Sequence, residues 1–411
     1  MRASLCRLAT SVALLGFVAA QSSDPRSQLS AALNGYPDLT LFQSLLSVAK
    51  DPFDQVVKSD TSDITVLVPT NEAIGKYLKK SGITNVTDLN AADLVTFFSY
   101  QIMAASLKGD DFKGSKGMVV PTFLKGAEYN NRSAGPELEK QYGDDRAAGQ
   151  VLFASEKDPS TRRMKRQGAG PVVDIRAGLA QDAEMQTVDV AWGSDGVNTF
   201  QIVDSVLSPP RNCSTTIRSF PDLELKSLDD SLVKAQLWPT LDAAFNVTCL
   251  APTTEAFKKA GDPQVTASKD EVSQLLLAHT LGEVTYSNFL TDGQVIGTLN
   301  NTKVTVHLKG NDIYFNNAKV IEANVLTNNG LLHVLDSVIK AEDDVSAKAT
   351  GSSTSSASKP SSTSASGTAS GTEAPSSTTA SVATTSETNA ASALAIGYTG
   401  VLAMAAGILL F

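Results

Sequence analysis

The sequence predicts an α+β fold that is built twice along one chain. The first observation is a repeated stretch, because ITVLVPTNEAI at residues 64–74 returns as VTCLAPTTEAF at residues 247–257, with six of the eleven positions identical. The second observation is the order of patterns, since helical spacing follows each stretch and alternating strands come later. Helices first and paired strands afterwards are typical of the α+β class. We therefore expect two domains of one architecture.

Each repeat opens with a strand that leads into a helix. The runs ITVLVP and VTCLAP are apolar, rich in β-branched residues and ended by proline, which predicts a buried strand. The following TNEAIGKYLKK and TTEAFKKAG have helical spacing. Thr70 or Asn71 in the first repeat, and Thr253 or Thr254 in the second, can cap these helices.

The later elements are clearest in the second repeat. DLVTFFSYQI and EVSQLLLAHTL predict one buried helix in each repeat. Strands then follow in the second repeat as KVTVHL, DIYFNN, AKVIEANVL and LLHVLDSVI, with Asn-Gly at 329–330 marking a turn before the last. Within each repeat we expect the first strand to pair with the last.

Further echoes place the domain boundaries. YPDL at 36–39 returns as FPDL at 220–223, and IVDSVL at 202–207 returns as VLDSVI at 334–339. The first domain is therefore expected at about 25–209 and the second at about 211–342. The offset between the copies falls from 178 at residues 94–102 to 132 at residues 202–207, so the first copy holds about 46 extra residues.

The extra residues are assigned to an insertion at about 108–170, which is rich in Gly, Lys, Asp and Arg. An insertion of this kind is typically a surface loop, although MVVPTFL and VLFAS within it could be strands. The pair Lys165-Arg166 is a candidate site for a processing protease. The alternative is a solvated basic loop that is not cut.

Both ends of the chain carry targeting signals. Arg2 and Arg7 precede the apolar run SVALLGFVAA and small residues before Gln21, which predicts a secretory signal peptide over residues 1–20. The alternative is an uncleaved N-terminal anchor. Residues 389–411 have small residues, a spacer and an apolar end, the pattern of a glycosylphosphatidylinositol (GPI) signal.

Asn389 is the favoured lipid attachment residue, with Ser386 and Ala390 as alternatives. A tail-anchored helix at 393–411 is the competing interpretation. Residues 343–388 are rich in Ser, Thr and Ala and have no apolar periodicity, which predicts a disordered, O-glycosylated stalk.

Composition limits the class of binding partner and indicates the redox state of the cysteines. The formal net charge of −9 argues against nucleic acid as a partner. Cys6 leaves with the signal peptide, so Cys213 and Cys249 are expected to form one disulfide in an oxidising compartment. Five N-glycosylation sequons, expected on the surface if used, stand at Asn85, Asn131, Asn212, Asn246 and Asn300.

These motifs resemble the fasciclin domain family. The resemblance rests on ITVLVPTNEAI and VTCLAPTTEAF, on NNGLLHVLDSVI at 328–339, and more loosely on GVNTFQIVDSVL at 196–207. The family also has a Tyr-His or similar pair in its central helix, and Ala278-His279 falls there. The resemblance implies a β-wedge wrapped with helices in each of two tandem domains. It also implies roles in adhesion or in surface and wall organisation, often in fungal GPI-anchored glycoproteins.

The sequence shows little sign of catalysis, a metal or a cofactor. His279 and His333 lie in apolar segments and align with Gln101 and Gln201, which favours structural hydrogen bonding. His307 is the third histidine, and no zinc motif, nucleophile elbow or phosphate loop is present. Asp204 and Asp336 could form the acid pair of a glycosidase. Their repetition at one position of both copies favours hydrogen bonds at a strand end.

We therefore expect a non-enzymatic protein of the outer plasma-membrane leaflet or the cell wall that binds an extracellular protein or glycan. Two alternatives remain: a vacuolar-membrane protein acting in membrane or autophagosome fusion, and a wall-polysaccharide-modifying enzyme. Trp192 and Trp238 are the only tryptophans, so platforms for sugar stacking are scarce.

Overall fold

The computed structural model describes residues 24–340 apart from 59–60, 62, 115, 158–170 and 221–223. These residues belong to one compact unit that contains both expected domains. The expected signal peptide, stalk and anchor, together with Asn389, Lys165 and Arg166, lie outside the described residues. Within those residues, no helix has the length and apolar character needed to cross a membrane.

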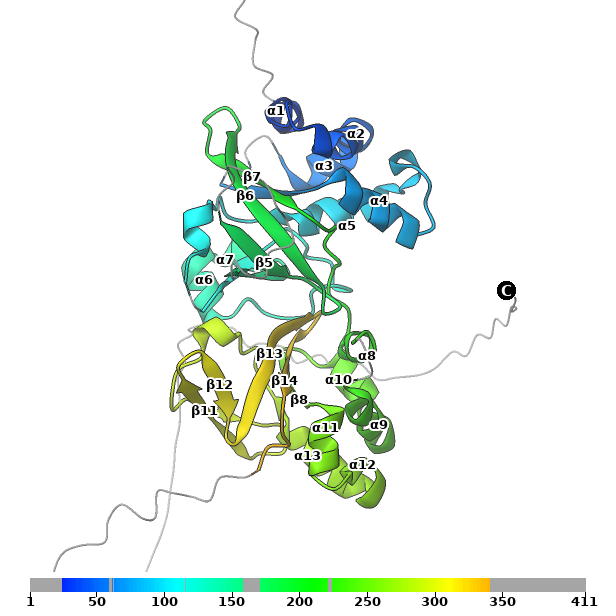
Figure 1. Ribbon diagram of the computed structural model, residues 1–411, viewed down its shortest axis with the longest axis vertical. Helices are drawn as coiled ribbons and strands as arrows, with labels where there is room; N and C mark the ends of the chain where they lie inside the picture. Colours follow the sequence, from blue (N-terminus) through cyan, green and yellow to red (C-terminus); the bar gives the residue numbers. More distant parts are fainter. Residues whose placement is uncertain are drawn as a thin grey trace, which may run out of the picture. The chain divides into compact units, whose positions relative to one another are not determined.

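The first domain contains strands β1 to β7 and helices α1 to α7 (Figure 1). Its strands are β1 (Thr65–Pro69), β2 (Ile102–Met103), β3 (Met118–Pro121), β4 (Val151–Glu156), β5 (Val172–Arg176), β6 (Asp182–Trp192) and β7 (Asn198–Val203). Its helices are α1 (Pro25–Ala32), α2 (Thr40–Val48), α3 (Lys50–Val56), α4 (Asn71–Lys80), α5 (Ala91–Gln101), α6 (Pro136–Tyr142) and α7 (Asp144–Ala147).

The second domain contains strands β8 to β14 and helices α8 to α13. Its strands are β8 (Val247–Pro252), β9 (Thr280–Leu281), β10 (Val295–Gly297), β11 (Lys303–Lys309), β12 (Asp312–Phe315), β13 (Ala318–Thr327) and β14 (Gly330–Leu335). Its helices are α8 (Cys213–Arg218), α9 (Lys226–Ala235), α10 (Trp238–Ala243), α11 (Thr254–Lys259), α12 (Pro263–Thr266) and α13 (Lys269–Ala278).

The two domains have the same strand order. The first sheet runs β2-β1-β7-β6-β5-β4-β3, and the second, read from the corresponding end, runs β9-β8-β14-β13-β12-β11-β10. In both, the first strand pairs in parallel with the last, as β1 with β7 and β8 with β14, while the other pairs are antiparallel. The predicted duplication and the predicted return of the first strand to the last are therefore confirmed.

Each sheet closes on itself. An isolated bridge joins Met103 of β2 to Thr122, just after β3, and so links the two ends of the first sheet. Leu281 of β9 and Thr298, just after β10, make the equivalent bridge in the second sheet. Closure leaves few unpaired strand edges. Each domain is thus a barrel-like sheet with helices packed on it.

The strand-to-helix turn of each repeat is built from the motif that the sequence repeats. The Thr70 side chain accepts a hydrogen bond from Ala73 N and caps α4, and Thr253 accepts from Ala256 N and caps α11. Each satisfies one of the backbone N–H groups that a helix leaves free at its start. The sequence left two capping residues open in each repeat, and the structure selects the first of each pair.

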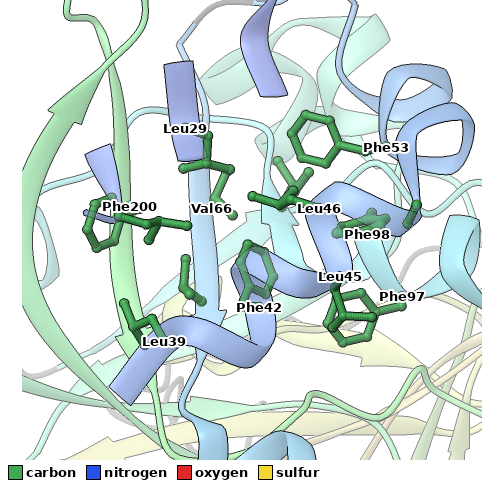
Figure 2. Packing of buried hydrophobic residues seen from close by; sticks show 14 of the residues in the cluster. Leu29, Leu39, Phe42, Leu45, Leu46, Phe53, Val66, Phe97, Phe98 and Phe200 are labelled. Atoms are coloured by element: carbon green, nitrogen blue, oxygen red, sulfur yellow. The ribbon is translucent and has the colours of Figure 1, made fainter. Parts of the chain in front are cut away.

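The helical layer of the first domain packs through large apolar side chains. Figure 2 shows Phe42, Phe53, Phe97 and Phe98 from helices α2, α3 and α5 meeting close to Val66 of β1. The rings of Phe53 and Phe98 lie edge to face, with centroids 5.3 Å apart. Burial of such side chains stabilises by roughly 1.5–3 kcal/mol each. The apolar spacing that predicted α5 is therefore explained by this core.

The extra residues of the first domain are divided between two connections, and the first of these contains helices. Residues 122–150 separate β3 from β4, where residues 298–302 separate β10 from β11 in the second domain. Residues 157–171 separate β4 from β5, where only residues 310–311 separate β11 from β12. The expectation of a surface loop over about 108–170 is therefore wrong in part, whereas the expectation that MVVPTFL and VLFAS could be strands is confirmed by β3 and β4. β3 and β4 belong to the barrel, and α6 and α7 lie within the first inserted segment.

The two domains contact each other within the compact unit. A β-bridge joins Gly178 to Leu326, and Val119 and Val151 of the first domain share a buried cluster with Leu326 and Leu331 of the second. No repeat or motif in the sequence predicts these contacts.

Candidate functional site

His279 is a hydrogen-bonded part of the fold in the second domain. Its Nδ1 lies 2.8 Å from Leu275 O, and its Nε2 accepts a hydrogen bond of 2.9 Å from Ile339 N. The side chain is buried, and burial lowers the pKa of His279 from 6.5 to about 4. The ring is therefore neutral at pH 7 and ties the end of α13 to the segment after β14.

His333 has the same character on β14. Its Nε2 lies 2.8 Å from Thr285 O, its Nδ1 is 3.4 Å from Asn324 N, and its ring packs 5.5 Å from that of Phe315. Burial lowers the pKa of His333 to about 4. The pairings Leu250 with His333 and Leu67 with Gln201 occupy equivalent positions, which shows that Gln201 replaces this histidine in the first domain.

Gln201 occupies the position of this histidine, and both atoms of its side-chain amide are hydrogen-bonded. Its Oε1 accepts from Val188 N at 2.7 Å and Asp189 N at 3.1 Å, and its Nε2 donates to Leu107 O at 3.0 Å and Asp189 Oδ1 at 2.8 Å. Three of these bonds hold the bulge of β6 against β7, and the fourth reaches Leu107. A structural role for this position is thus shown in both domains.

Gln101, which aligns with His279, is different. Its side chain is fully buried, and neither amide atom has a hydrogen-bond partner among the described residues. A buried polar group without a partner is costly. The alignment with His279 was the only sequence signal at this position, and it did not reveal the missing partners.

Asp204 and Asp336 make the hydrogen bonds expected at a strand end. Asp204 Oδ1 accepts from Glu184 N at 2.8 Å, and Asp336 Oδ1 accepts from Lys319 N at 3.0 Å. In each case the backbone N–H of the aspartate donates to the carbonyl of the same partner residue. The two carboxylates therefore repeat one structural position, in separate barrels, and do not form an acid pair.

Cys213 and Cys249 are brought together as the sequence expected. Both are buried, and their Sγ atoms lie 3.5 Å apart without a covalent bond. The hydrogen bond with Cys249, and then burial, hold the pKa of the Cys213 thiol well above its usual range. A disulfide needs an Sγ–Sγ distance of about 2.05 Å, so the bond remains a prediction that a small side-chain shift would satisfy.

The five sequon asparagines differ in exposure. Asn85 is exposed, whereas Asn131, Asn212, Asn246 and Asn300 are half-buried. Asn212 caps α8 and donates to Asp242 Oδ2 at 3.1 Å. Asn131 donates to Ala244 O at 3.3 Å and Asn246 donates to Ser133 Oγ at 2.8 Å, so both lie at the contact between the domains.

Neither tryptophan offers a free face for stacking on a sugar. Trp192 is buried and donates to Thr199 O at 2.9 Å. Trp238 donates to Asp229 Oδ1 at 3.0 Å, and the Arg218 guanidinium covers its ring at 5.1 Å.

The remaining candidates for binding are clefts. A cleft of about 330 Å³ lies between residues 133–138 and the segment 283–294, and a larger one of about 670 Å³ lies within the first domain. In the described part of the chain, no group of three or more His, Cys, Asp or Glu side chains is arranged to hold a metal ion. The arrangement supports binding at a surface more directly than bond-making chemistry.

Comparison with known proteins places this architecture. A family model described as the fasciclin domain matches residues 223–341. A fasciclin-like arabinogalactan protein of Arthroderma benhamiae is 24% identical over 322 residues, which cover 77% of this chain and 64% of that protein. A fasciclin-like arabinogalactan protein of Phaeosphaeria nodorum, elcF, is 23% identical over 324 residues, which cover 76% of this chain and 88% of that protein.

Periostin of Homo sapiens is 26% identical over 144 residues, which cover 34% of this chain and 17% of periostin. The chain thus spans less than two thirds of the length of periostin and of the Arthroderma protein. A solved FAS1 domain pair from the insect cell adhesion molecule fasciclin I overlaps 75% of this chain and 98% of its own, at 15% identity and a TM-score of 0.33.

The fold assignment rests on the strand order and on the family match. Residues 223–341 coincide with the second barrel from α9 to β14, and the first barrel repeats its strand order. The family match thus identifies the second barrel as a fasciclin domain, and it covers residues 223–341 of this chain.

Proposed function

We propose that this protein is a non-enzymatic binding protein of the cell surface or cell wall, presented on a lipid-anchored, glycosylated stalk. The observation that supports the proposal is that the side chains with the best chemistry for catalysis are used to hold the fold. His279, His333, Asp204 and Asp336 are all engaged in hydrogen bonds that hold the fold. What is left for function is the surface of two barrels.

The names of the fungal relatives support a wall or surface role, since both are fasciclin-like arabinogalactan proteins. Our proposal extends this to adhesion, with an extracellular protein or glycan as the partner. Many anchored copies acting together allow weak individual contacts to suffice, because anchoring raises the effective concentration. A shallow surface is then adequate.

The anchor is part of the proposal and depends on residues 389–411, with Asn389 as the attachment residue. Removing residues 389–411 should release the protein into the medium. Phosphatidylinositol-specific phospholipase C should release the full-length protein from intact cells. Retention on the surface in both experiments would contradict the lipid anchor.

The adhesion role is tested by comparing cells that display the full chain with cells that lack it. We expect displaying cells to bind wall fragments or neighbouring cells more strongly, and phospholipase treatment should remove the difference. Equal binding with and without the displayed protein would contradict adhesion. Fluorescence of a tagged chain on the vacuole membrane would favour the fusion role, and turnover of wall polysaccharide would favour an enzyme.

A further inference from the structure

A basic cleft lies in the first domain, and all of its lining residues belong to that domain. Its volume is about 670 Å³. Three cations line it from separate segments of the chain: Lys58 follows α3, Lys125 follows β3, and Arg146 lies on α7. Lys58 and Lys125 are 67 positions apart in the chain, and Lys125 and Arg146 are 21 positions apart, so only folding brings these three charges together.

Arg146 is held in place by the fold. Its Nη1 donates to Asp63 O at 3.0 Å and to Ala104 O at 3.1 Å, and its Nη2 lies 3.8 Å from the Asp63 carboxylate. The guanidinium is 39% exposed, so it also faces solvent. A guanidinium that is already oriented loses less conformational entropy when it binds an oxyanion.

The two lysines are free to turn toward a ligand. Lys125 Nζ donates to Asp145 O at 3.0 Å, which uses one of its three N–H groups. The backbone of Lys58 bonds to Thr61, but its ammonium has no hydrogen bond or ion pair with another described residue, and both lysines are exposed. Each ammonium can therefore offer protons to a bound group.

The local charge contrasts with that of the whole chain. Among the described residues that line the cleft, Asp145 is the acidic one, and Asp63 lies beside Arg146. Three cations thus face two carboxylates, whereas the chain as a whole has a formal net charge of −9. A small basic cleft on an acidic protein concentrates anions at that point.

The rest of the cleft suits the carbon skeleton of a small molecule. Val56, Val95 and Phe123 form part of its wall, and Ser99 adds a polar group. The Ser99 side chain has no hydrogen-bond partner among the described residues. Apolar walls with a few convergent polar groups are typical of sites for small ligands.

The second domain lacks the same set of cations. Thr122 and Thr298 make equivalent bridges, so Lys125 corresponds to Asn301, three residues after the bridge in each domain. Arg146 belongs to the segment 122–150, which has only residues 298–302 as its counterpart. The additional segment of the first domain therefore supplies two of the three charges.

We propose that this cleft binds the oxyanion of a small acidic ligand, with Lys58, Lys125 and Arg146 contacting its carboxylate or phosphate oxygens. The oxyanion could come from an acidic sugar or from a phosphate ester, and the two sources share this chemistry. The inference adds a subsite to the proposed surface role but does not depend on it, since it concerns the first domain alone.

The test is calorimetric titration of the purified full chain in detergent with three probes: trigalacturonate, inositol hexakisphosphate and neutral maltotriose. We expect one of the two anionic probes to bind the parent chain, with an affinity that falls as the salt concentration rises. The same probe should bind roughly tenfold more weakly to Lys58→Gln and to Lys125→Gln, because each variant loses a charge-assisted hydrogen bond. The anionic probe that binds identifies the source.

The matched control is Lys303→Gln, which removes an exposed lysine of β11 in the second domain. It should leave the affinity unchanged. Lys58→Gln is the decisive variant, since the Lys58 side chain holds no part of the fold, whereas Arg146 also bonds to two carbonyl groups. Failure of both anions to bind, equal binding of maltotriose, or equal losses in Lys303→Gln and Lys58→Gln would each overturn the proposal.

Discussion

At the scale of single residues, two glutamines of one domain show how hydrogen bonding decides the effect of burial. Gln101 and Gln201 are both fully buried. Gln201 makes four hydrogen bonds, and Gln101 makes none with the described residues. A buried glutamine therefore stabilises the fold at position 201, whereas at position 101 its amide lacks hydrogen-bond partners.

We predict opposite effects of the same substitution at these two positions. Gln101→Leu should raise the free energy of unfolding by roughly 1–2 kcal/mol, because it removes a buried polar group that has no partner. Gln201→Leu should lower it by about 2 kcal/mol or more, because it leaves Val188 N, Asp189 N and Leu107 O without their partner. Urea denaturation of both variants measures this. A loss of stability in Gln101→Leu would show that the amide has a partner, such as a bound water.

The two buried histidines predict a pH dependence. The folded-state pKa of His279 and His333 is about 4, below the ordinary value of 6.5. The unfolded chain therefore takes up protons between pH 6.5 and pH 4 that the folded chain does not. Their contribution to stability is present in full above pH 6.5 and is lost as the pH falls toward 4, by an amount on the order of 3 kcal/mol for each.

The measurement is the denaturation midpoint of the protein at pH 7 and pH 5. The control is the variant His279→Gln with His333→Gln, which places the glutamines of the first domain at both positions and removes their titration. Its midpoint should change less between the two pH values. Equal changes in the variant and the parent chain would assign the pH dependence to carboxylates instead.

At the scale of elements, Cys213 and Cys249 connect the start of α8 to β8. A disulfide between them would close a loop through residues 214–248. In the chain-entropy model a loop of this length contributes roughly 3–4 kcal/mol. The Sγ atoms already lie 3.5 Å apart, so little native-state strain is expected on closure.

We predict that the secreted protein carries this disulfide. Its mass should rise by two hydrogen atoms on reduction, and the reduced protein should unfold at lower temperature. Cys213→Ser should reproduce the loss of stability without any reductant. Alkylation of both thiols in the denatured protein, without any reductant, would show that the bond is absent.

At the scale of the whole molecule, one half-buried arginine joins the two domains of the compact unit. Arg176 Nη1 donates to Ala323 O at 2.7 Å and lies 3.1 Å from Glu322 Oε1, while its Nε lies 2.9 Å from Asp182 Oδ1. The Arg176 side chain is 18% exposed and that of Glu322 is 28% exposed. Burial raises the pKa of Glu322, and the nearby guanidinium opposes that rise.

We predict a coupling of about 1–2 kcal/mol between Arg176 and Glu322 in a double-mutant cycle of Arg176→Met and Glu322→Gln. The matched control is Lys319 with Asp312, an ion pair of 2.7 Å within the second domain whose side chains are 36% and 46% exposed. That pair should couple by less than about 1 kcal/mol, because water screens exposed charges. Equal couplings for the two pairs would show that the domains do not hold Arg176 against Glu322.

The sequence by itself determined what depends on neighbouring residues and on repetition. The motif ITVLVPTNEAI and its copy predicted a strand, a capped helix and a duplicated domain, and the structure confirms all three. Apolar alternation also predicted the strands from β11 to β14, although the last predicted run extends to residue 339 and β14 ends at Leu335. These features follow from local backbone preferences and from the period of side chains along a strand or helix.

Only the tertiary structure decided which distant side chains meet. The partners of Gln201, the cross-domain bonds of Arg176 and the grouping of Lys58, Lys125 and Arg146 depend on how the barrel closes and where its added segment lies. The sequence assigned that segment to one insertion with two possible strands, whereas folding divides the added residues between two connections and places both strands in the sheet. Contacts between residues far apart in the chain depend on the register and closure of the whole sheet, which no local pattern records.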